Sequence, residues 1–263
     1  MSFVEAFVEL RTRGDVAWIR RDLAALGAAP FWAAVEPIAG AKGRGGVGRL
    51  QVGGVELVVR PYRRGGAFGR LLDDRYPSAV RARRELELLQ SLREDGVPVV
   101  VPVAALGRRR RAFWRLRLCT EWLAESLPLP AFLAAHPAAR RRAVEAVGVV
   151  LRLAFAAGLR HPDLHPDNVL CRDHGDKVRA VLVDLDRAQR GAPVTPAQRD
   201  AMLARMRRYV VRHQKRLAAV PTRAESLRFL RALGLDRRER HELWRRVDAQ
   251  VQRTVRRRRW LRR

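Results

Sequence analysis

The feature that most constrains the fold is the loop HPDLHPDN at residues 161–168, which leads into two short apolar segments. The segments read NVLCR and KVRAVLVDL, and the turn-forming residues Asp173 to Asp176 separate them. Apolar segments joined by such a turn predict a β-hairpin. The hairpin would return Asp184, at the end of its second strand, to the neighbourhood of Asn168.

This arrangement matches the requirements of phosphoryl transfer. The reaction needs an acceptor for the proton of the attacking hydroxyl and oxygen ligands for Mg²⁺. Asp163 suits the first task, and Asn168 and Asp184 suit the second, because hard divalent cations prefer such oxygen ligands. The spacing H-x-D-L-x-x-x-N is typical of kinases. We therefore predict an ATP-dependent phosphotransferase with Asp163 as base and Asn168 and Asp184 as metal ligands.

Other interpretations of the same loop remain open. Its prolines, aspartates and asparagine also suit a plain connection between a helix and a strand. A metallohydrolase site could use His161, Asp163, His165 and Asp167, although the other histidines are scattered along the chain. We expect His161 to brace the loop through hydrogen bonds, with simple packing as the alternative.

A predicted helix at residues 78–95 carries a second candidate group. Its apolar stripe is formed by Ala82, Leu86, Leu89 and Leu92, and Glu85 lies within that stripe. A buried carboxylate needs a cation, and Arg60 at the end of strand ELVV is the expected partner. Kinases use such a pair to position the α- and β-phosphates, usually with lysine as the cation. Alternatively, Glu85 reaches solvent from the helix edge.

Two further segments are candidate nucleotide contacts. The glycine-rich stretch containing Gly43, Gly45 and Gly46 could fold over phosphates through its backbone N–H groups, although a plain hairpin turn fits equally well. The strand that ends around Glu121 lies where a hinge would hydrogen-bond adenine.

The order of the predicted elements indicates the fold class. Strands with one helix precede helices with one hairpin, which is typical of a two-lobed α+β fold like that of protein kinases. The β-rich N-terminal lobe would span residues 1–120 and begin with a helical extension, since Trp18, Ile19, Leu23 and Leu26 show helical spacing. The helical C-terminal lobe would span residues 121–263, with a basic tail from about residue 197.

Charge and composition narrow the location and the partners. The formal charge is +27, and residues 199–263 hold 22 arginines and lysines against 6 acids, so anionic partners are expected. Only three of the basic residues are lysines, so genomic base composition also explains part of the arginine content. The isolated Cys119 and Cys171 favour a reducing compartment, and the first twenty residues lack the apolar run of a secretory signal.

Several strings in the first half resemble one kinase family. The run LVVRPYRRGG at 57–66, LDDRY at 72–76 and the Glu85 helix ending in Gly-Val-Pro are similar to the lipopolysaccharide kinases. The resemblance is nearest to those acting on 3-deoxy-D-manno-octulosonic acid (Kdo), covers about residues 40–190, and includes arginine in the lysine position. HPDLHPDN has proline and histidine where Kdo kinases are more varied, and the tail after Pro196 is longer and more basic, so these departures leave the acceptor open.

The resemblance implies a substrate and a location. The acceptor would be a Kdo or heptose hydroxyl of the lipid A–core precursor at the cytoplasmic face of the inner membrane. The arginine-rich end of the tail, around Trp260, would then attach to the anionic lipid surface, and we expect no specific nucleic-acid binding. Two other functions remain open, an aminoglycoside- or choline-type kinase and a weakly active kinase fold that binds polyanions or membranes.

Overall fold

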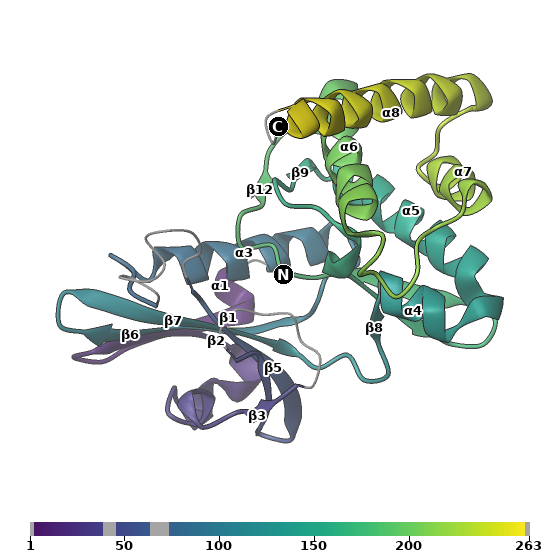
Figure 1. Cartoon of the computed structure of the whole chain (residues 1–263). Helices are drawn as coiled ribbons and strands as arrows, with labels where there is room; N and C mark the ends of the chain where they lie inside the picture. The colour runs from purple at the N-terminus through teal and green to yellow at the C-terminus, as the bar shows by residue number, and fades with distance from the viewer. Residues whose placement is uncertain (1–2, 39–45, 64–73, 261–263) are drawn as a thin grey trace. The chain divides into compact units, whose positions relative to one another are not determined.

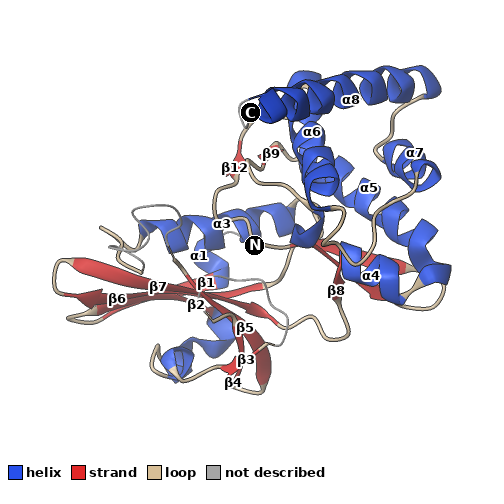
Figure 2. Cartoon of the chain, viewed as in Figure 1, coloured by secondary structure: helices blue, strands red, loops and turns tan. Residues whose placement is uncertain are grey.

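The computed structural model describes residues 3–38, 46–63 and 74–260, with side chains through residue 254. The chain forms two compact units (Figure 1). Residues 1–94 and 100–123 make up the N-terminal unit, and residues 95–99 and 124–263 make up the C-terminal unit. The N-terminal unit contains most of the strands, and the C-terminal unit most of the helices (Figure 2).

An antiparallel sheet organises the N-terminal unit. Its described strands follow the order β1-β2-β6-β7-β5-β4-β3. Leu57, Val59, Ile19 and Phe31 are fully buried in a cluster on the sheet. The elements of this unit are α1 (Phe3–Ala6), β1 (Phe7–Arg11), β2 (Asp15–Arg20), the 3₁₀ helices η1 (Arg21–Leu26) and η2 (Pro30–Trp32), β3 (Glu36–Pro37), β4 (Gly48–Val52), β5 (Val55–Pro61), α3 (Val80–Glu94), β6 (Pro102–Arg110) and β7 (Phe113–Glu121).

The helical extension predicted at the start of the chain is wrong for residues 7–20, which form strands β1 and β2. Strands β1 and β2 pair antiparallel, with Phe7 opposite Arg20 and Arg11 opposite Val16. Strand β2 also pairs with β6, so it lies inside the sheet rather than at its edge. A strand buried on both faces has consecutive apolar residues, and the run from Val16 to Ile19 is buried throughout. That run loses the alternation that identifies a strand.

Helix α3 confirms the predicted helix at 78–95. It contacts β6 and β7, and its buried side chains are Ala82, Glu85, Leu86, Leu89 and Leu92. Strand β6 extends to Arg110 and β7 begins at Phe113, and the turn between them includes Arg111, which has a φ of 57°.

The C-terminal unit surrounds a short hairpin with helices. The hairpin pairs Val169 with Leu182 and Asp173 with Val178, as the sequence predicted. The elements are β8 (Leu127–Pro128), α4 (Leu129–Ala135), η3 (Pro137–Ala139), α5 (Arg140–Ala156), β9 (Leu159–Arg160), η4 (Pro166–Asn168), β10 (Val169–Asp173), β11 (Val178–Leu182), β12 (Gln189–Arg190), α6 (Pro196–His213), α7 (Arg223–Ala232) and α8 (Arg237–Trp260).

Two glycines permit close backbone contacts in this unit. A Cβ on Gly148 of α5 would lie 2.6 Å from both the Ala232 side chain and the Phe229 carbonyl of α7. Gly158 has a φ of 76°, and a Cβ there would lie 2.0 Å from the carbonyl oxygen of Gly191. Gly158 therefore lets the chain turn from α5 into β9 against the segment after β12. This contact fixes the approach to residues 161–168.

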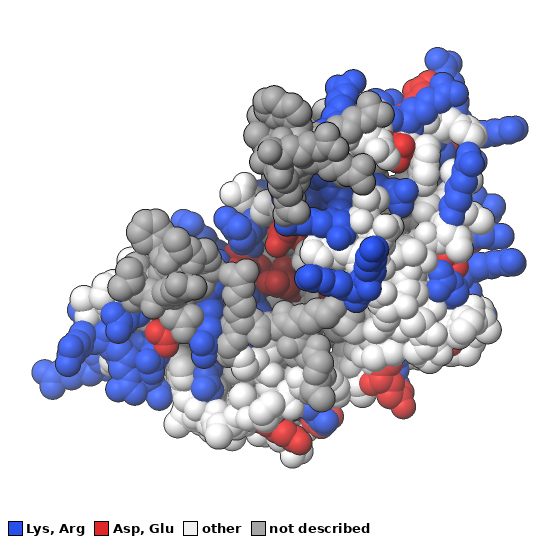
Figure 3. All heavy atoms as spheres, in the orientation of Figure 1, with Lys and Arg blue, Asp and Glu red and all other residues white. Residues whose placement is uncertain are grey.

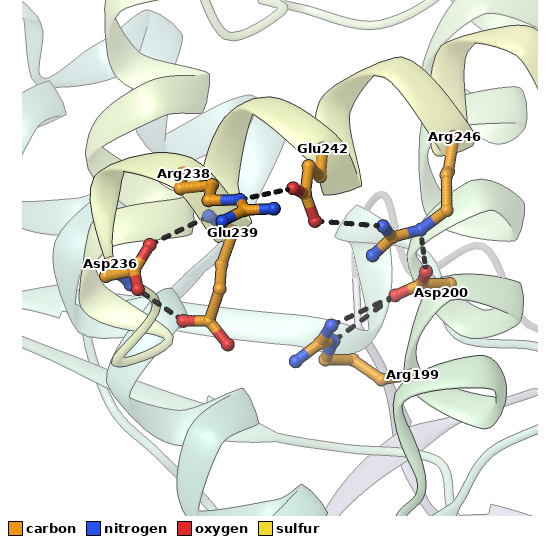
Figure 4. A network of polar contacts seen from close by, with 7 residues as sticks. All are labelled: Arg199, Asp200, Asp236, Arg238, Glu239, Glu242 and Arg246. Atoms are coloured by element: carbon orange, nitrogen blue, oxygen red, sulfur yellow. Dashed lines mark hydrogen bonds and ion pairs between the residues drawn. The ribbon is translucent and has the colours of Figure 1, made fainter.

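Ion pairs join α8 to α6 (Figure 4). Arg246 of α8 lies 2.8 Å from the carboxylate of Asp200 in α6, and Arg199 contacts the same carboxylate at 3.2 Å. Glu242 extends the network along α8 by pairing with Arg238 at 2.9 Å. Ion pairs near the surface contribute little individually, but this network connects the two helices through Asp200.

A buried ion pair anchors α7. The Arg140 guanidinium of α5 bonds to both oxygens of Glu225, at 2.6 and 2.8 Å. Glu225 also closes a capping box with Thr222, whose hydroxyl accepts from the Glu225 N–H at 3.2 Å. The Arg140 hydrogen bonds lower the pKa of Glu225 to about 2, against a smaller opposing effect of burial. The pair therefore stabilises the unit only while Glu225 is ionised.

Replacing Arg140 with Gln removes the charge partner of buried Glu225. The free energy of unfolding is expected to fall by about 3 kcal/mol at neutral pH. Because the folded state depresses the pKa of Glu225 from 4.5 to about 2, this contribution is complete above pH 4.5 and is lost as the pH falls towards 2. Urea denaturation at pH 7 and at pH 3.5 should therefore show a smaller difference between wild type and variant at the lower pH.

Arg238→Gln is the matched control, because it breaks an ion pair whose arginine side chain is 88% exposed. It is expected to leave the free energy of unfolding nearly unchanged at either pH. Equal effects of the two substitutions, or a pH-independent effect of Arg140→Gln, would contradict the assigned role of the buried pair.

Candidate active site

The segment 161–168 lies between β9 and β10 of the C-terminal unit. Strand β9 pairs with β12, and this pairing positions the start of the segment. The 3₁₀ helix η4 ends the segment at Asn168. Leu164 is 1% exposed and anchors the middle of the segment in the core, whereas Asp163 is exposed. The buried Leu164 therefore anchors the segment, while the Asp163 carboxylate is exposed to solvent.

His161 connects this segment to the strand end at Asp184. The ring is buried, its Nδ1 accepts from the Asp163 backbone N–H at 3.1 Å, and its Nε2 lies 3.0 Å from the Asp184 carbonyl oxygen. Because an N–H donor faces Nδ1, the proton must be on Nε2, which then donates to Asp184. Burial lowers the pKa of His161, which favours this neutral form. The bracing predicted for His161 is therefore the observed geometry.

Two more hydrogen bonds bring the predicted metal ligands together. The Asn168 side-chain amide donates to the Asp163 carbonyl at 3.1 Å, and the Val183 N–H donates to the Asn168 carbonyl at 2.9 Å. Asp184 follows directly, with a φ of 59° that is uncommon for a non-glycine residue. These hydrogen bonds join the segments that carry Asp163, Asn168 and Asp184.

The donor set suits a hard cation. Since the Asn168 amide nitrogen is used by Asp163, its Oδ1 is the atom left to bind a ligand. In the described part of the chain, no three His, Cys, Asp or Glu side chains gather as a metal site. Mg²⁺ is commonly held by one or two protein oxygens together with phosphates and water. The metallohydrolase alternative is weakened because both ring nitrogens of His161 are already hydrogen-bonded.

Helix α6 supports the segment 161–168 through an aromatic contact that the sequence did not indicate. The Tyr209 ring stacks on His165 with centroids 4.5 Å apart, and its hydroxyl donates to Asp167. Burial, followed by the Asp167 hydrogen bond, raises the pKa of Tyr209, so the phenol stays protonated as a donor. The helical spacing in residues 196–213 gave no indication of this contact, because it depends on where the loop passes α6.

In the N-terminal unit, the predicted ion pair between Arg60 and Glu85 is formed. Arg60 lies 2.6 Å from both Glu85 oxygens, and the Glu85 side chain is only 2% exposed. Tyr62, which the sequence analysis assigned no role, donates its hydroxyl to the same carboxylate and lies under the Arg60 guanidinium at 4.7 Å. Three groups therefore hold one another at the end of β5.

The other predicted nucleotide contacts are only partly described. Gly46 is exposed with a φ of 79°, while Gly43 and Gly45 lie outside the described residues, as do Arg64 to Asp73 of the family-like strings. The Glu121 carboxylate pairs with Arg20 of β2. The backbone N–H of Glu121 donates to the Val101 carbonyl at 2.9 Å. The Glu121 side chain therefore has a structural contact within its own unit.

Both cysteines are buried in strands, at Cys119 of β7 and Cys171 of β10. Burial raises the pKa of each thiol to about 12, so neither is a nucleophile at neutral pH.

Basic side chains occur on both units in the face shown in Figure 3. Among the described residues, no helix meets the length and apolar content that a bilayer span requires.

Comparison with known families decides the relationship. The model of the lipopolysaccharide kinase (Kdo/WaaP) family matches residues 30–232. The chain belongs to this family. The match includes β5, α3 and the 161–184 region, and excludes β1, β2 and helix α8.

Individual relatives of this lipopolysaccharide kinase agree with the family match. A 3-deoxy-D-manno-octulosonic acid kinase of Vibrio vulnificus (strain YJ016) is 33% identical over 171 residues, which cover 63% of this chain and 72% of the relative. One from Haemophilus influenzae (strain 86-028NP) is 32% identical over 169 residues, covering 60% and 70%. The chain is accordingly a phosphotransferase that acts on a sugar hydroxyl in lipopolysaccharide core synthesis.

One solved structure establishes the fold. WaaP, determined in complex with acyl carrier protein, aligns with a TM-score of 0.58 over 89% of this lipopolysaccharide kinase and 92% of WaaP, at 23% identity. At that identity the likeness concerns the fold alone. The predicted kinase-like α+β fold is confirmed.

The hydrogen bonds of His161 generate a spectroscopic prediction. Long-range ¹H–¹⁵N spectra of labelled protein should show a neutral ring with its proton on Nε2 at pH 7. Since burial lowers the pKa, the ring should remain mostly neutral at pH 6.5. The exposed His174 provides the reference signal in the same sample. A proton on Nδ1, or a charged ring at pH 7, would contradict the geometry.

Proposed function

We propose that this kinase transfers the γ-phosphoryl group of Mg-ATP to a hydroxyl of Kdo in the lipid A–core precursor. The observation that carries the proposal is that relatives above 30% identity, matched over about 70% of their own length, are Kdo kinases. A heptose of the core is the second candidate, because the resemblance to the lipopolysaccharide kinases implies either sugar as acceptor.

The C-terminal unit supplies the chemical groups. Asp163 accepts the proton of the sugar hydroxyl as its oxygen attacks the γ-phosphorus, and ADP leaves with the bridging oxygen. Asn168 Oδ1 and the Asp184 carboxylate would hold Mg²⁺, which neutralises charge on the phosphates. The hydrogen bonds of His161 and Asn168 support this proposal, because they orient both ligand residues relative to Asp163.

The N-terminal unit supplies groups for nucleotide binding. Arg60, held by Glu85 and Tyr62, would contact the α- and β-phosphates in place of the usual lysine. Gly43, Gly45 and Gly46 would offer backbone N–H groups to the phosphates, and the backbone near Glu121 would bind adenine. A guanidinium suits the first role because its planar donors match phosphate oxygens in pairs.

Transfer of labelled γ-phosphate from Mg-ATP to a Kdo-bearing lipid A precursor tests the function. Wild type is expected to label the lipid, and Asp163→Asn is expected to reduce kcat by at least about 10²-fold with little change in the KM for ATP. Chelation of Mg²⁺ should abolish labelling. Asp176→Asn is the matched control, because it changes an exposed aspartate in the hairpin turn.

Rival acceptors distinguish the alternatives in the same assay. Label on an aminoglycoside or choline, with none on the lipid, would replace the Kdo assignment by a small-molecule kinase. Label on a heptose-bearing core alone would assign the acceptor hydroxyl to heptose. Undiminished transfer by Asp163→Asn would refute its role as the base.

We further propose that the enzyme attaches peripherally to the cytoplasmic face of the inner membrane through its C-terminal end. Residues 256–263 contain six arginines beside Trp260 and Leu261, and they lie beyond the part that the family model matches. Each basic residue near an anionic surface contributes about 1 kcal/mol, and an aromatic ring favours the interface.

Removal of residues 255–263 tests this attachment. Full-length protein should sediment with vesicles containing phosphatidylglycerol, and the truncated protein should bind at least about 100-fold more weakly. Binding of the full-length chain should fall with added salt, and neutral phosphatidylcholine vesicles should bind neither protein. Equal binding of both proteins to anionic vesicles would place the membrane contact elsewhere.

A further inference from the structure

A pocket of about 300 Å³ lies beside the catalytic loop, within the C-terminal unit. It is formed by the loop, by strands β9 and β12, by the residues just before β12 and by helix α6. The lining residues used below are Arg160, His161, Pro162, Arg187, Gln189 and Gln198. Asp163 is not part of the lining, but it directly follows Pro162, so the pocket borders the segment that carries the residue assigned as the base.

The pocket lining carries positive charge and includes no acidic side chain. Two guanidinium groups line it, from Arg160 and Arg187, and its lining contains no aspartate or glutamate. Nearby arginines are neutralised, since Arg190 pairs with Asp95 and Arg199 with Asp200. A concave site with cations alone attracts an anion more strongly than an exposed surface does.

The donors of this pocket are also unsatisfied. Arg160 makes one long hydrogen bond, 3.4 Å to the Ala192 carbonyl, and its buried Nε has no partner. Arg187 is exposed and makes no hydrogen bond or ion pair with the residues that the structure describes. Gln198 accepts from the Thr195 N–H through Oε1 at 3.1 Å, which leaves its amide NH₂ as a donor. Arg160, Arg187 and Gln198 therefore have N–H donors available for an oxygen acceptor.

We propose that this pocket binds the carboxylate of an acidic sugar acceptor and thereby positions its hydroxyl beside Asp163. The inference rests on the proposed function, in which the acceptor is an octulosonic acid. Guanidinium groups match the two oxygens of a carboxylate, and the Gln189 and Gln198 amides suit the neighbouring hydroxyls. Arg160 and Arg187 would thus be specificity residues that distinguish an acidic sugar from a neutral one.

Steady-state kinetics with a pair of acceptors tests the proposal. One is a Kdo-bearing lipid A precursor, and the other is the same molecule with the carboxylate converted to a carboxamide. Arg187→Gln and Arg160→Gln are each expected to raise the KM for the acidic acceptor about 10- to 100-fold, with kcat and the KM for ATP changed less than about threefold. The carboxamide should show a similarly raised KM with wild type and little further change with the variants.

Arg179→Gln is the matched control, because it removes one exposed arginine of β11 in the same unit and preserves the pocket. It is expected to leave every parameter unchanged. Arg187→Gln is the more informative variant, since its exposed side chain can be removed without affecting folding, and the thermal midpoint checks this. Equal losses in Arg179→Gln, or equal sensitivity of both acceptors, would overturn the proposal.

Binding without turnover separates failure of this proposal from failure of the proposed function. Calorimetric titration with free Kdo should give heat with wild type that the Arg160→Gln/Arg187→Gln double variant loses. Kdo binding by the pocket without phosphorylation would refute the Kdo kinase function while supporting the pocket. Phosphorylation with unchanged binding in the double variant would refute the pocket alone. Competition by inorganic phosphate stronger than by Kdo would refute the carboxylate assignment.

Discussion

The neutral imidazole of His161 is the connection on which the candidate site depends. It accepts a hydrogen bond from the segment 161–168 and donates one to the strand end at Asp184, so Asp163 and Asp184 are held by opposite sides of a single ring. Separating the segments would leave two backbone groups unpaired next to a buried ring, which is costly. The same contact explains how Asp184 retains its left-handed conformation, since its carbonyl is held in place.

The surroundings of this connection are built from a different kind of contact. Tyr209 stacks on His165 and bonds to Asp167, so α6 supports the loop from one side, and Gly158 fixes its entry. In a chain with a formal charge of +27, acids are scarce, and the buried Glu85 and Glu225 each have an arginine partner. Burying these carboxylates is tolerable only because a guanidinium is supplied with each.

The sequence predicted the site better than it predicted the start of the chain. The loop, the hairpin and the Glu85 helix were predictable because each has a local signal: a spacing, a turn or an apolar stripe. Residues 7–20 were not, because β2 is buried on both faces and its consecutive apolar residues imitate part of a helical stripe. Tyr62 and Tyr209 escaped prediction because their partners depend on how separate elements pack.

In the phosphate-binding role proposed for it, Arg60 also changes how this kinase can be detected. Reagents that identify kinases by acylating the nucleotide-site lysine need a primary amine, which a guanidinium does not provide. None of the three lysines, at positions 42, 177 and 215, lies in β5, where Arg60 contacts Glu85. An arginine side chain also stays protonated at any physiological pH, so it cannot become nucleophilic by losing its proton. Surveys of bacterial kinases based on lysine chemistry would therefore overlook an enzyme whose phosphate-binding cation is arginine.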